Sequence, residues 1–82
     1  MDSVRERIEG FIRSDLLLGD DSRMPSPGES LVESGVVDST GILELIEFIE
    51  DEFGVHVEDT ETVPENLDGI DRLVAYVQRK SG

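Results

Sequence analysis

The pair Asp38-Ser39 places a carboxylate beside a hydroxyl nucleophile, directly before an acidic and apolar run that ends at Phe53-Gly54. Asp and Ser are both preferred helix caps, so one interpretation is that the pair only caps the following helix. Two caps in a row are redundant for one helix, however. The backbone N–H groups at a helix N-terminus favour an anion, so a phosphate ester on the Ser39 hydroxyl would be stabilised there. Both interpretations stay open at this point.

Other residues offer less chemistry. His56 is the sole His and the chain has no Cys, so we expect a packing or loop role for His56 and no transition-metal site. A Ser-His-Asp triad would need Ser39 and His56 to meet an Asp, and no nucleophile-elbow pattern surrounds Ser39. The acidic runs at 20–21 and 50–52 do not match the spacing of an EF-hand loop. We interpret them as solvated acidic surface and keep a small calcium-binding helical protein as a weak alternative.

The length bounds the function. A chain of 82 residues forms one domain, here taken as 1–82, with a modest core and little room for a deep active site. We therefore expect a protein that is not an enzyme. Without Cys, any thiol chemistry requires a thiol added from outside. No apolar run has the length of a membrane span, and the first residues lack the apolar core of a signal peptide, so we expect a cytoplasmic protein.

The charge is distributed in blocks. The net charge is −13; residues 24–71 hold fourteen Asp and Glu and no Lys or Arg, whereas residues 72–82 hold three basic residues and no acidic ones. Such a field repels nucleic acid and anionic membranes and speeds encounters with basic protein surfaces. The block pattern favours partner recognition over simple solubility.

The elements that must position Asp38-Ser39 begin with a helix near the N-terminus. Ser3-x-x-Glu6 is a capping box and predicts a helix from Val4 to about Leu17 with one apolar face. Residues 19–35, GDDSRMPSPGESLVESG, predict a long loop, in which two apolar residues, Leu31 and Val32, contact the core. The alternative for part of this loop is a short helix at 30–34, because another capping box begins there.

The clearest element is a helix from Ser39 to about Phe53 that stops at Gly54. Apolar residues at helical spacing predict its core-facing stripe: Ile42, Leu45, Ile46, Ile49 and Phe53. Acidic residues lie on the other side: Glu44, Glu47, Glu50 and Asp51.

The C-terminal part is predicted to begin with a brief extended piece at Val55 and Val57, then one helical turn at 59–63 that Pro64 interrupts. Asp68 is predicted to cap a last helix, with Arg79 and Lys80 at its C-terminal end, where cations suit the helix dipole. The sum is an all-α, four-helix bundle of three long helices and one short one, with a long loop between the first two; its handedness stays undetermined. The predicted core contains Ile8, Phe11, Ile12, Leu45, Ile46, Ile49, Phe53, Leu73, Val74 and Val77.

At this point the residues show a resemblance. The segment GVVDST at 35–40, followed by LIEFIEDEFG at 45–54, resembles the acyl carrier proteins and the related peptidyl carrier domains. Their hallmark is Gly-x-x-Asp-Ser-Leu at the start of an acidic second helix. The segment TVPENLDGI at 62–70 resembles the Thr-Pro-Glu-Asn-Phe-Asp-Ser-Ile region of free-standing carrier proteins. The resemblance covers nearly the whole chain, and implies an acyl-carrier-protein-like bundle.

The resemblance implies that Ser39 bears a 4′-phosphopantetheine arm, which a phosphopantetheinyl transferase installs from coenzyme A. The arm would end in the thiol that this sequence lacks and would carry an acyl or aminoacyl group as a thioester. Asp38 would help to place the metal and the coenzyme A phosphates in the transferase complex. The acidic docking face for basic patches on partner enzymes would comprise Glu44, Glu47, Glu50 and Asp51. The expected partners are the transferase, a loading ligase and downstream transferases or synthases. We expect a monomer with no metal site and no nucleic-acid or membrane partner.

Two positions depart from the family pattern. Thr40 replaces the usual Leu after the Ser, which commonly packs near the arm, and Glu47 stands where many relatives carry Met or another apolar contact residue. A more polar docking face suggests a specialised set of partners, and the segments around Ser39 and at 62–70 favour carriers that serve discrete ligases, including those that load amino acids. The alternative of a different class is an acidic interaction module without a covalent prosthetic group.

Overall fold

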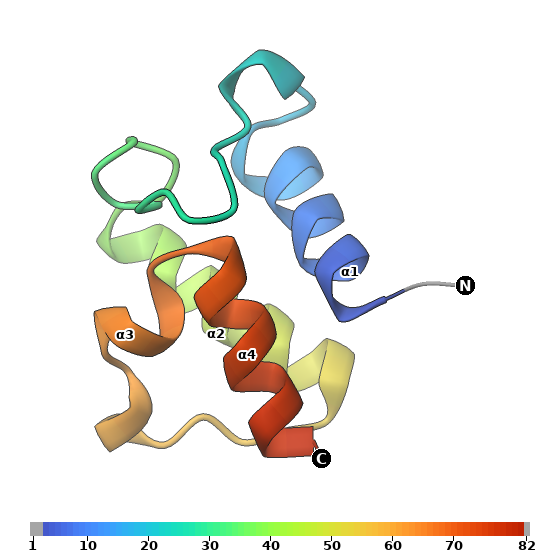
Figure 1. The fold of residues 1–82 in the computed structure, drawn as a ribbon, viewed down its shortest axis with the longest axis vertical. Coiled ribbons are helices and arrows are strands. Elements are labelled where there is room, and N and C mark those ends of the chain that lie inside the picture. Colours follow the sequence, from blue (N-terminus) through green and yellow to red (C-terminus); the bar gives the residue numbers. More distant parts are fainter. Residues whose placement is uncertain (1–2, 82) are drawn as a thin grey trace.

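The computed structural model describes residues 3–81, with Asp21 described by its backbone alone, and these residues form helices and no strand. The α-helices are α1 (Val4–Phe11), α2 (Ser39–Phe53), α3 (Pro64–Leu67) and α4 (Ile70–Ser81) (Figure 1). A π-helical segment, Ile12–Leu16, extends α1, and short 3-10 turns lie at Asp21–Arg23 and Asp59–Glu61. The predicted all-α bundle of long helices and one short helix is confirmed.

Helix α1 begins where the capping box predicts. Ser3 is the N-cap, and its Oγ accepts a hydrogen bond from the N–H of Glu6 at 3.1 Å. The helical path continues to Leu16, close to the predicted end at about Leu17, but its last part, Ile12–Leu16, is π-helical. There the Ser14 hydroxyl donates to the carbonyl of Gly10 at 2.8 Å, a side-chain bond that competes with the helical ladder and accompanies the wider turn. Leu18 then adopts a left-handed conformation with φ of 53° and ends the helical path.

Helix α2 has the predicted bounds. It begins at Ser39 and ends at Phe53, and Gly54 adopts the left-handed C-cap conformation with φ of 67°. The N–H of Gly54 donates to the carbonyl of Glu50 at 3.0 Å. Glycine is favoured here because it adopts positive φ without a steric penalty on Cβ.

The C-terminal segments differ in two details from the prediction. Pro64 does not merely interrupt a turn: it is the first residue of α3, where its missing N–H costs nothing and its fixed φ suits a helix. The prediction that Asp68 caps α4 is wrong. Its carboxylate instead accepts hydrogen bonds from the Ser30 hydroxyl and from the N–H of Val32 in the long loop. Arg79 and Lys80 lie in the last turn of α4, as predicted.

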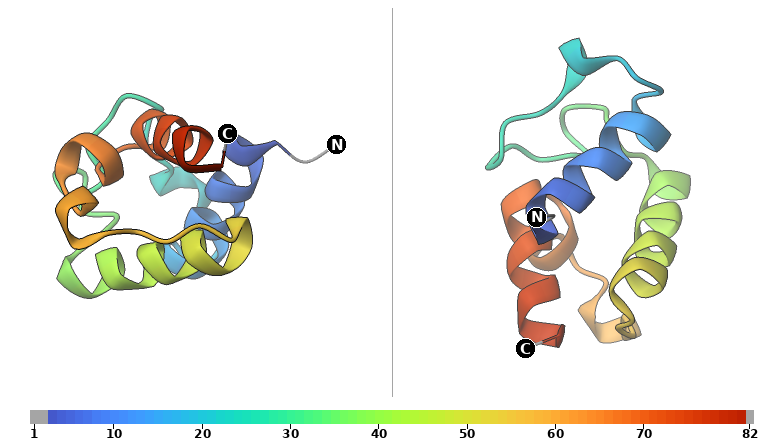
Figure 2. Two further views of the ribbon diagram at one scale, coloured as in Figure 1. Left: turned by 90° about the horizontal axis from the view of Figure 1, so that it is seen from below. Right: turned by 90° about the vertical axis from the view of Figure 1, so that its right-hand side faces the viewer.

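The helices enclose one core, with α1 packed against α4 and α3 against the start of α4 (Figures 1 and 2). Seven of the ten predicted core residues are buried: Ile8, Ile12, Leu45, Ile49, Leu73, Val74 and Val77. The other three are partly buried and pack against this cluster: Phe11, Ile46 and Phe53. The core therefore forms along the helix faces that the periodicity predicts.

The long loop is folded onto this core by a different set of residues from the one predicted. Leu31 is fully buried, as expected, but Val32 is 51% exposed, so its predicted core contact is wrong. Residues 31–35 form a turn, not the alternative short helix. Val36 and Val37, at the end of the loop, are buried instead.

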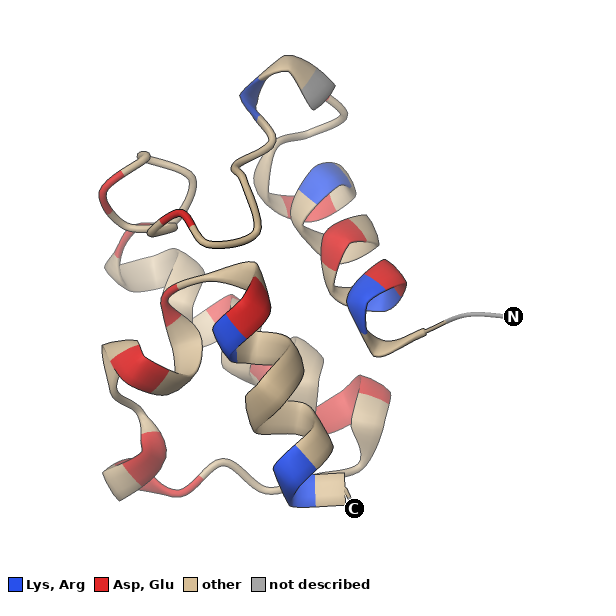
Figure 3. Cartoon of the chain, viewed as in Figure 1, with Lys and Arg blue, Asp and Glu red and all other residues tan. Residues whose placement is uncertain are grey.

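No helix within the described residues is long and apolar enough to cross a membrane. Acidic residues are spread over α2, the 3-10 turn at 59–61 and α3, whereas basic residues lie on α1, where they alternate with acidic ones, and at both ends of α4 (Figure 3). The block charge of the sequence thus becomes an acidic region centred on α2 and its neighbours. Within residues 3–81 no group of three acidic or His side chains is arranged to hold a metal ion.

Candidate functional site

The N-terminus of α2 separates the roles of Asp38 and Ser39. Asp38 has extended backbone angles and is the N-cap: its Oδ1 accepts a hydrogen bond from the N–H of Gly41 at 2.8 Å. Its carbonyl accepts from the N–H of Ile42 at 3.0 Å, the first bond of the helix. Ser39 is the first helical residue and does not cap the helix. The helix end therefore needs only one of the two side chains.

Ser39 is exposed, and its hydroxyl has no hydrogen-bond partner among the described residues. Thr40, beside it, is also exposed. A recess of about 280 Å³ lies next to these residues, lined by Asp38, Thr40, Gly41 and Glu44 together with Asp15 and Leu16 from the π-helical segment. The free hydroxyl thus stands at the positive end of the helix dipole, between two residues, Asp38 and Thr40, that line the recess.

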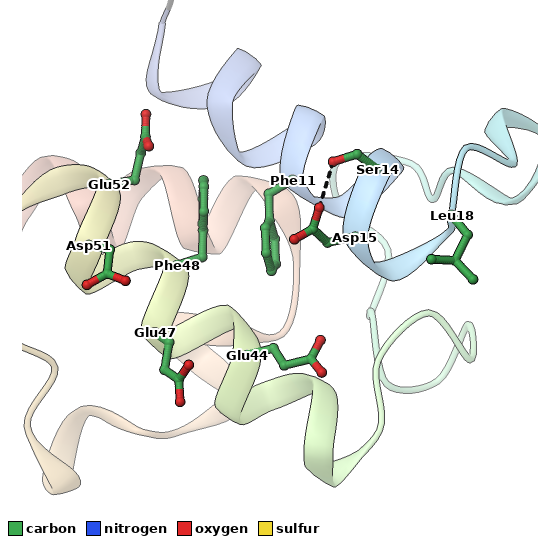
Figure 4. Close-up of a pocket in the computed structure, with 9 residues that line it drawn as sticks. All are labelled: Phe11, Ser14, Asp15, Leu18, Glu44, Glu47, Phe48, Asp51 and Glu52. Carbon is green, nitrogen blue, oxygen red and sulfur yellow. Dashed lines mark hydrogen bonds between the residues drawn. The ribbon is translucent and has the colours of Figure 1, made fainter.

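A larger groove of about 620 Å³ runs between the π-helical end of α1 and α2 (Figure 4). Its floor holds two phenyl rings, Phe11 and Phe48, which stack with centroids 4.3 Å apart. Three of the four predicted docking residues line it: Glu44, Glu47 and Asp51. None of the three has an ion-pair or hydrogen-bond partner within residues 3–81, so their charge faces solvent uncompensated by a neighbouring side chain.

Glu50, the fourth predicted docking residue, lies apart from this groove. Its Oε2 accepts a hydrogen bond from the N–H of Val57 at 2.9 Å and lies 3.3 Å from Nδ1 of His56. Its side chain is 33% exposed. Glu50 therefore holds the segment after α2, and His56 has the loop role that was expected for it.

An apolar recess of about 280 Å³ lies on the other side of α2, between that helix and α3. Its lining includes Ile42, one turn along α2 from Ser39, together with Val63 and Leu67. The exposed Val32 of the long loop also contributes to it. The N-terminus of α2 is thus flanked by the recess at Asp38 and Thr40 on one side and by an apolar recess at Ile42 on the other.

The residues before Asp38 are held tightly. The N–H groups of Val36 and Val37 both donate to the carbonyl of Leu31, at 3.0 and 3.2 Å. Gly41 lets Val37 pack against the first turn of α2, because a Cβ at that position would lie 3.2 Å from Cγ1 of Val37. The segment that presents Ser39 is therefore packed on both its loop side and its helix side.

The strongest perturbations of titration lie away from Ser39, where Glu61 meets α4. The Lys80 ammonium, which donates to Oε1 of Glu61 at 2.9 Å, and the N–H of Glu58 lower the pKa of Glu61 to about 2. Burial, together with the hydrogen bond that its hydroxyl donates to Glu61 at 3.0 Å, raises the pKa of Tyr76 to about 12. This cluster joins the turn at 59–61 to α4, and we assign it to stability.

Sequence reasoning found Asp38, Ser39 and the acidic side of α2 but not the aromatic floor of the groove. Phe48 lies off the core stripe of α2, and an aromatic residue outside a core stripe was the one available signal. The pairing of Phe11 with Phe48 and the link from Asp68 to the loop join residues far apart in the chain. No local pattern predicts such pairs.

No protein-family profile and no curated protein sequence matches this chain. A solved structure does: the chain is 30% identical, with a TM-score of 0.73, to a chain of a crystal structure described as that of a FAD-dependent dehydrogenase. The match covers 85% of this chain and 97% of that chain, which is therefore no longer than this one. At this identity and coverage the two chains belong to one family of small helical chains.

Proposed function

We propose that this chain is a carrier protein that holds acyl or aminoacyl groups as thioesters on a 4′-phosphopantetheine arm attached to Ser39. The observation that carries the proposal is that Asp38 and Ser39 have different roles at the N-terminus of α2. Asp38 alone caps the helix, which leaves the Ser39 hydroxyl exposed and without a partner within the described residues. A phosphodiester on that hydroxyl would meet the positive end of the helix dipole.

The attachment reaction requires little from the carrier itself. Oγ of Ser39 attacks the phosphorus next to the pantetheine of coenzyme A, and a new P–O bond forms as the pyrophosphate bond breaks. Adenosine 3′,5′-bisphosphate leaves, and the hydroxyl proton passes to a base of the transferase. The chain contributes an accessible oxygen at a fixed place, and Asp38 contributes the cap that keeps the first turn of α2 in register. The arm supplies the thiol.

Exposed carboxylates support a role in brief encounters with several enzymes. Glu44, Glu47 and Asp51 lie within about three and a half turns of Ser39 along α2, so a partner that engages them reaches the arm at the same time. Uncompensated surface charge gives fast, weak and salt-sensitive association with basic patches. We include a flavin-dependent dehydrogenase among the partner classes to test, because of the description of the matched crystal structure. The proposal places the protein in the cytoplasm, where coenzyme A is available.

The second candidate is an acidic interaction module that never carries a covalent group. The uncompensated carboxylates favour it as much as they favour a carrier. It assigns no role to the free hydroxyl of Ser39, whereas the carrier proposal does. We do not propose flavin binding for this chain, because dinucleotides are typically bound at the edge of a parallel sheet and residues 3–81 contain no strand.

Intact-protein mass spectrometry tests the proposal. The chain is incubated with coenzyme A, magnesium and a broad-specificity phosphopantetheinyl transferase, alongside Ser39→Ala and the control Ser26→Ala, which removes another exposed hydroxyl. We expect wild type and Ser26→Ala to gain one phosphopantetheine and Ser39→Ala to gain none. No gain on wild type, with the transferase active on a known carrier, would refute the carrier function and leave the acidic interaction module.

A further inference from the structure

The loop that leads to Ser39 is tied to the junction of α3 and α4 by Asp68. Oδ2 of Asp68 accepts a hydrogen bond from the Ser30 hydroxyl at 2.5 Å, and Oδ1 accepts from the N–H of Val32 at 2.9 Å. We call these three residues the Asp68 clasp. Both oxygens of one carboxylate are thus used to hold two neighbouring positions of a loop that lies more than thirty residues earlier in the chain.

The clasp encloses a residue whose carbonyl holds the next segment. Leu31, between Ser30 and Val32, is fully buried, and its carbonyl accepts from the N–H groups of Val36 and Val37 and from the Ser34 hydroxyl. Val37 is followed at once by the cap and the free hydroxyl of the proposed site. A continuous path of hydrogen bonds therefore runs from the carboxylate of Asp68 to the backbone directly before α2.

The loop approaches the junction closely at a second place. The N–H of Asp71, in the first turn of α4, donates to the carbonyl of Pro27 at 3.0 Å. Gly69 is buried with φ of 155°, and a Cβ there would lie 3.5 Å from the carbonyl oxygen of Glu29. These contacts bring the loop backbone against the junction, whereas the clasp links the junction directly to the turn whose Leu31 carbonyl accepts from Val36 and Val37.

The ionised form of Asp68 suits this role. Partial burial raises the pKa of Asp68, but the hydrogen bonds from the Ser30 hydroxyl and from the N–H groups of Val32 and Leu31 lower it, and the net pKa lies below its ordinary value of 3.8. A carboxylate that accepts two hydrogen bonds in a partly buried place makes stronger bonds than a neutral acceptor. The clasp is therefore intact at neutral pH.

We infer that Asp68 is a positioning residue for the modification of Ser39: it fixes the turn at 30–35, and through the carbonyl of Leu31 it fixes the place at which α2 presents the hydroxyl. The inference rests on the proposed function for the reaction, and its geometric part stands independently. Asp68 itself contacts neither the arm nor coenzyme A. It acts through the loop, so its loss leaves the docking residues of α2 in place.

The test compares Asp68→Ala with Asp71→Ala, a matched control on the same junction. Asp71 forms an exposed ion pair with Arg5 at 2.6 Å, and such pairs contribute little to stability. The first readout is amide hydrogen exchange of the unmodified protein. We expect Asp68→Ala to speed exchange at Val36 and Val37 by about tenfold or more, as expected for a local opening, with the centre of α4 still protected. Asp71→Ala leaves both segments protected.

The second readout is the kinetics of loading by the transferase. We expect kcat for Asp68→Ala to fall by about tenfold, because the nucleophile is misplaced, while KM for the carrier changes less than about twofold, because the docking carboxylates are intact. Ser30→Ala, which removes one bond of the clasp, changes both readouts in the same direction by less. It also serves as the test if Asp68→Ala does not fold.

Unchanged exchange at Val36 and Val37 in both clasp variants would overturn the inference. So would faster exchange without a fall in kcat, because the clasp would then stabilise the loop without positioning Ser39. If wild type itself is not loaded, the proposed function fails, and the exchange experiment still decides whether Asp68 holds the loop.

Discussion

Raising the pH should deprotonate the phenol of Tyr76 and thereby break the packing between α4 and the turn at 59–61. Tyr76 is 1% exposed, and its hydroxyl donates to Oε1 of Glu61 at 3.0 Å. Burial first, then this hydrogen bond and the negative charge of Glu61, raise the pKa of Tyr76 to about 12 from an ordinary value of 10.0. The neutral phenol is therefore the form that the folded chain stabilises.

The sign and size of the effect follow from linkage. The folded pKa lies above the unfolded one, so the contribution of Tyr76 is fully present below pH 10 and is lost as pH rises towards the folded value of about 12. A shift of about two pKa units corresponds to at most about 3 kcal/mol of unfolding free energy, and solvent screening near the hydroxyl lowers this upper bound. For a chain of 82 residues this is a large share of the expected total stability.

The assay is unusually direct, because the chain contains one Tyr and no Trp. The absorbance of tyrosinate reports on Tyr76 alone. We expect its midpoint near pH 12 in the folded protein, or a cooperative rise at lower pH if alkaline unfolding comes first, and near pH 10 in concentrated urea. Circular dichroism recorded in parallel separates these two cases.

Glu61→Gln is the matching perturbation. It removes the negative charge beside the phenol, so the midpoint of Tyr76 should fall, whereas Glu65→Gln on the exposed side of α3 should leave it unchanged. A folded-state midpoint equal to that in urea would refute the reasoning, because the phenol would then be neither buried nor bonded to Glu61.

Four further outcomes are expected. Replacing Glu61 with Gln should also destabilise the fold above pH 4.5, and this difference should vanish as pH falls through about 2, since the folded pKa of Glu61 is depressed; a difference in urea unfolding that persists in strong acid would contradict this. Leu45→Ala empties a fully buried site on α2 and should lower the free energy of unfolding by about 2–5 kcal/mol, measured by urea denaturation; a loss below about 1 kcal/mol would show that Leu45 is not in the core. Gly54→Ala places a Cβ in a left-handed C-cap and should cost about 1 kcal/mol, although no atom lies within 4 Å; equal stability of the variant would mean that the cap has another conformation. Glu44→Lys should slow association with the cognate loading enzyme and reduce its salt dependence without unfolding the chain, whereas Glu65→Lys should change neither; equal rates for wild type and Glu44→Lys would remove Glu44 from the docking face.

Helix α2 could be predicted almost to the residue, because every signal for it is local. Asp38 and Ser39 at its start, the apolar stripe along it and Gly54 at its end are all read from neighbouring positions. Helix propensity, capping and periodicity depend on residues within a few turns of one another, so they can be read directly from the sequence. The same holds for the start of α1 at Ser3 and for the cations at the end of α4.

The long loop could not be predicted in the same way, because its conformation depends on partners elsewhere in the chain. Val32 and Leu31 are adjacent apolar residues, but in the folded chain Leu31 is fully buried, whereas Val32 is exposed and its N–H donates to Asp68. Asp68 has the local features of a helix cap, but its carboxylate turns to the loop. A sequence pattern cannot decide between two partners when one of them is set by tertiary packing.

By itself the sequence determined that this protein is a small acidic helical bundle, and that Asp38 and Ser39 lie at the N-terminus of its most regular helix. Only the tertiary structure decided which of the two caps that helix, which acidic residues share the groove with Phe11 and Phe48, and that Glu50 lies elsewhere. The physical reason is range. Capping and periodicity are encoded within a few residues, whereas the exposure of a hydroxyl and the grouping of charges arise when distant segments pack against one another.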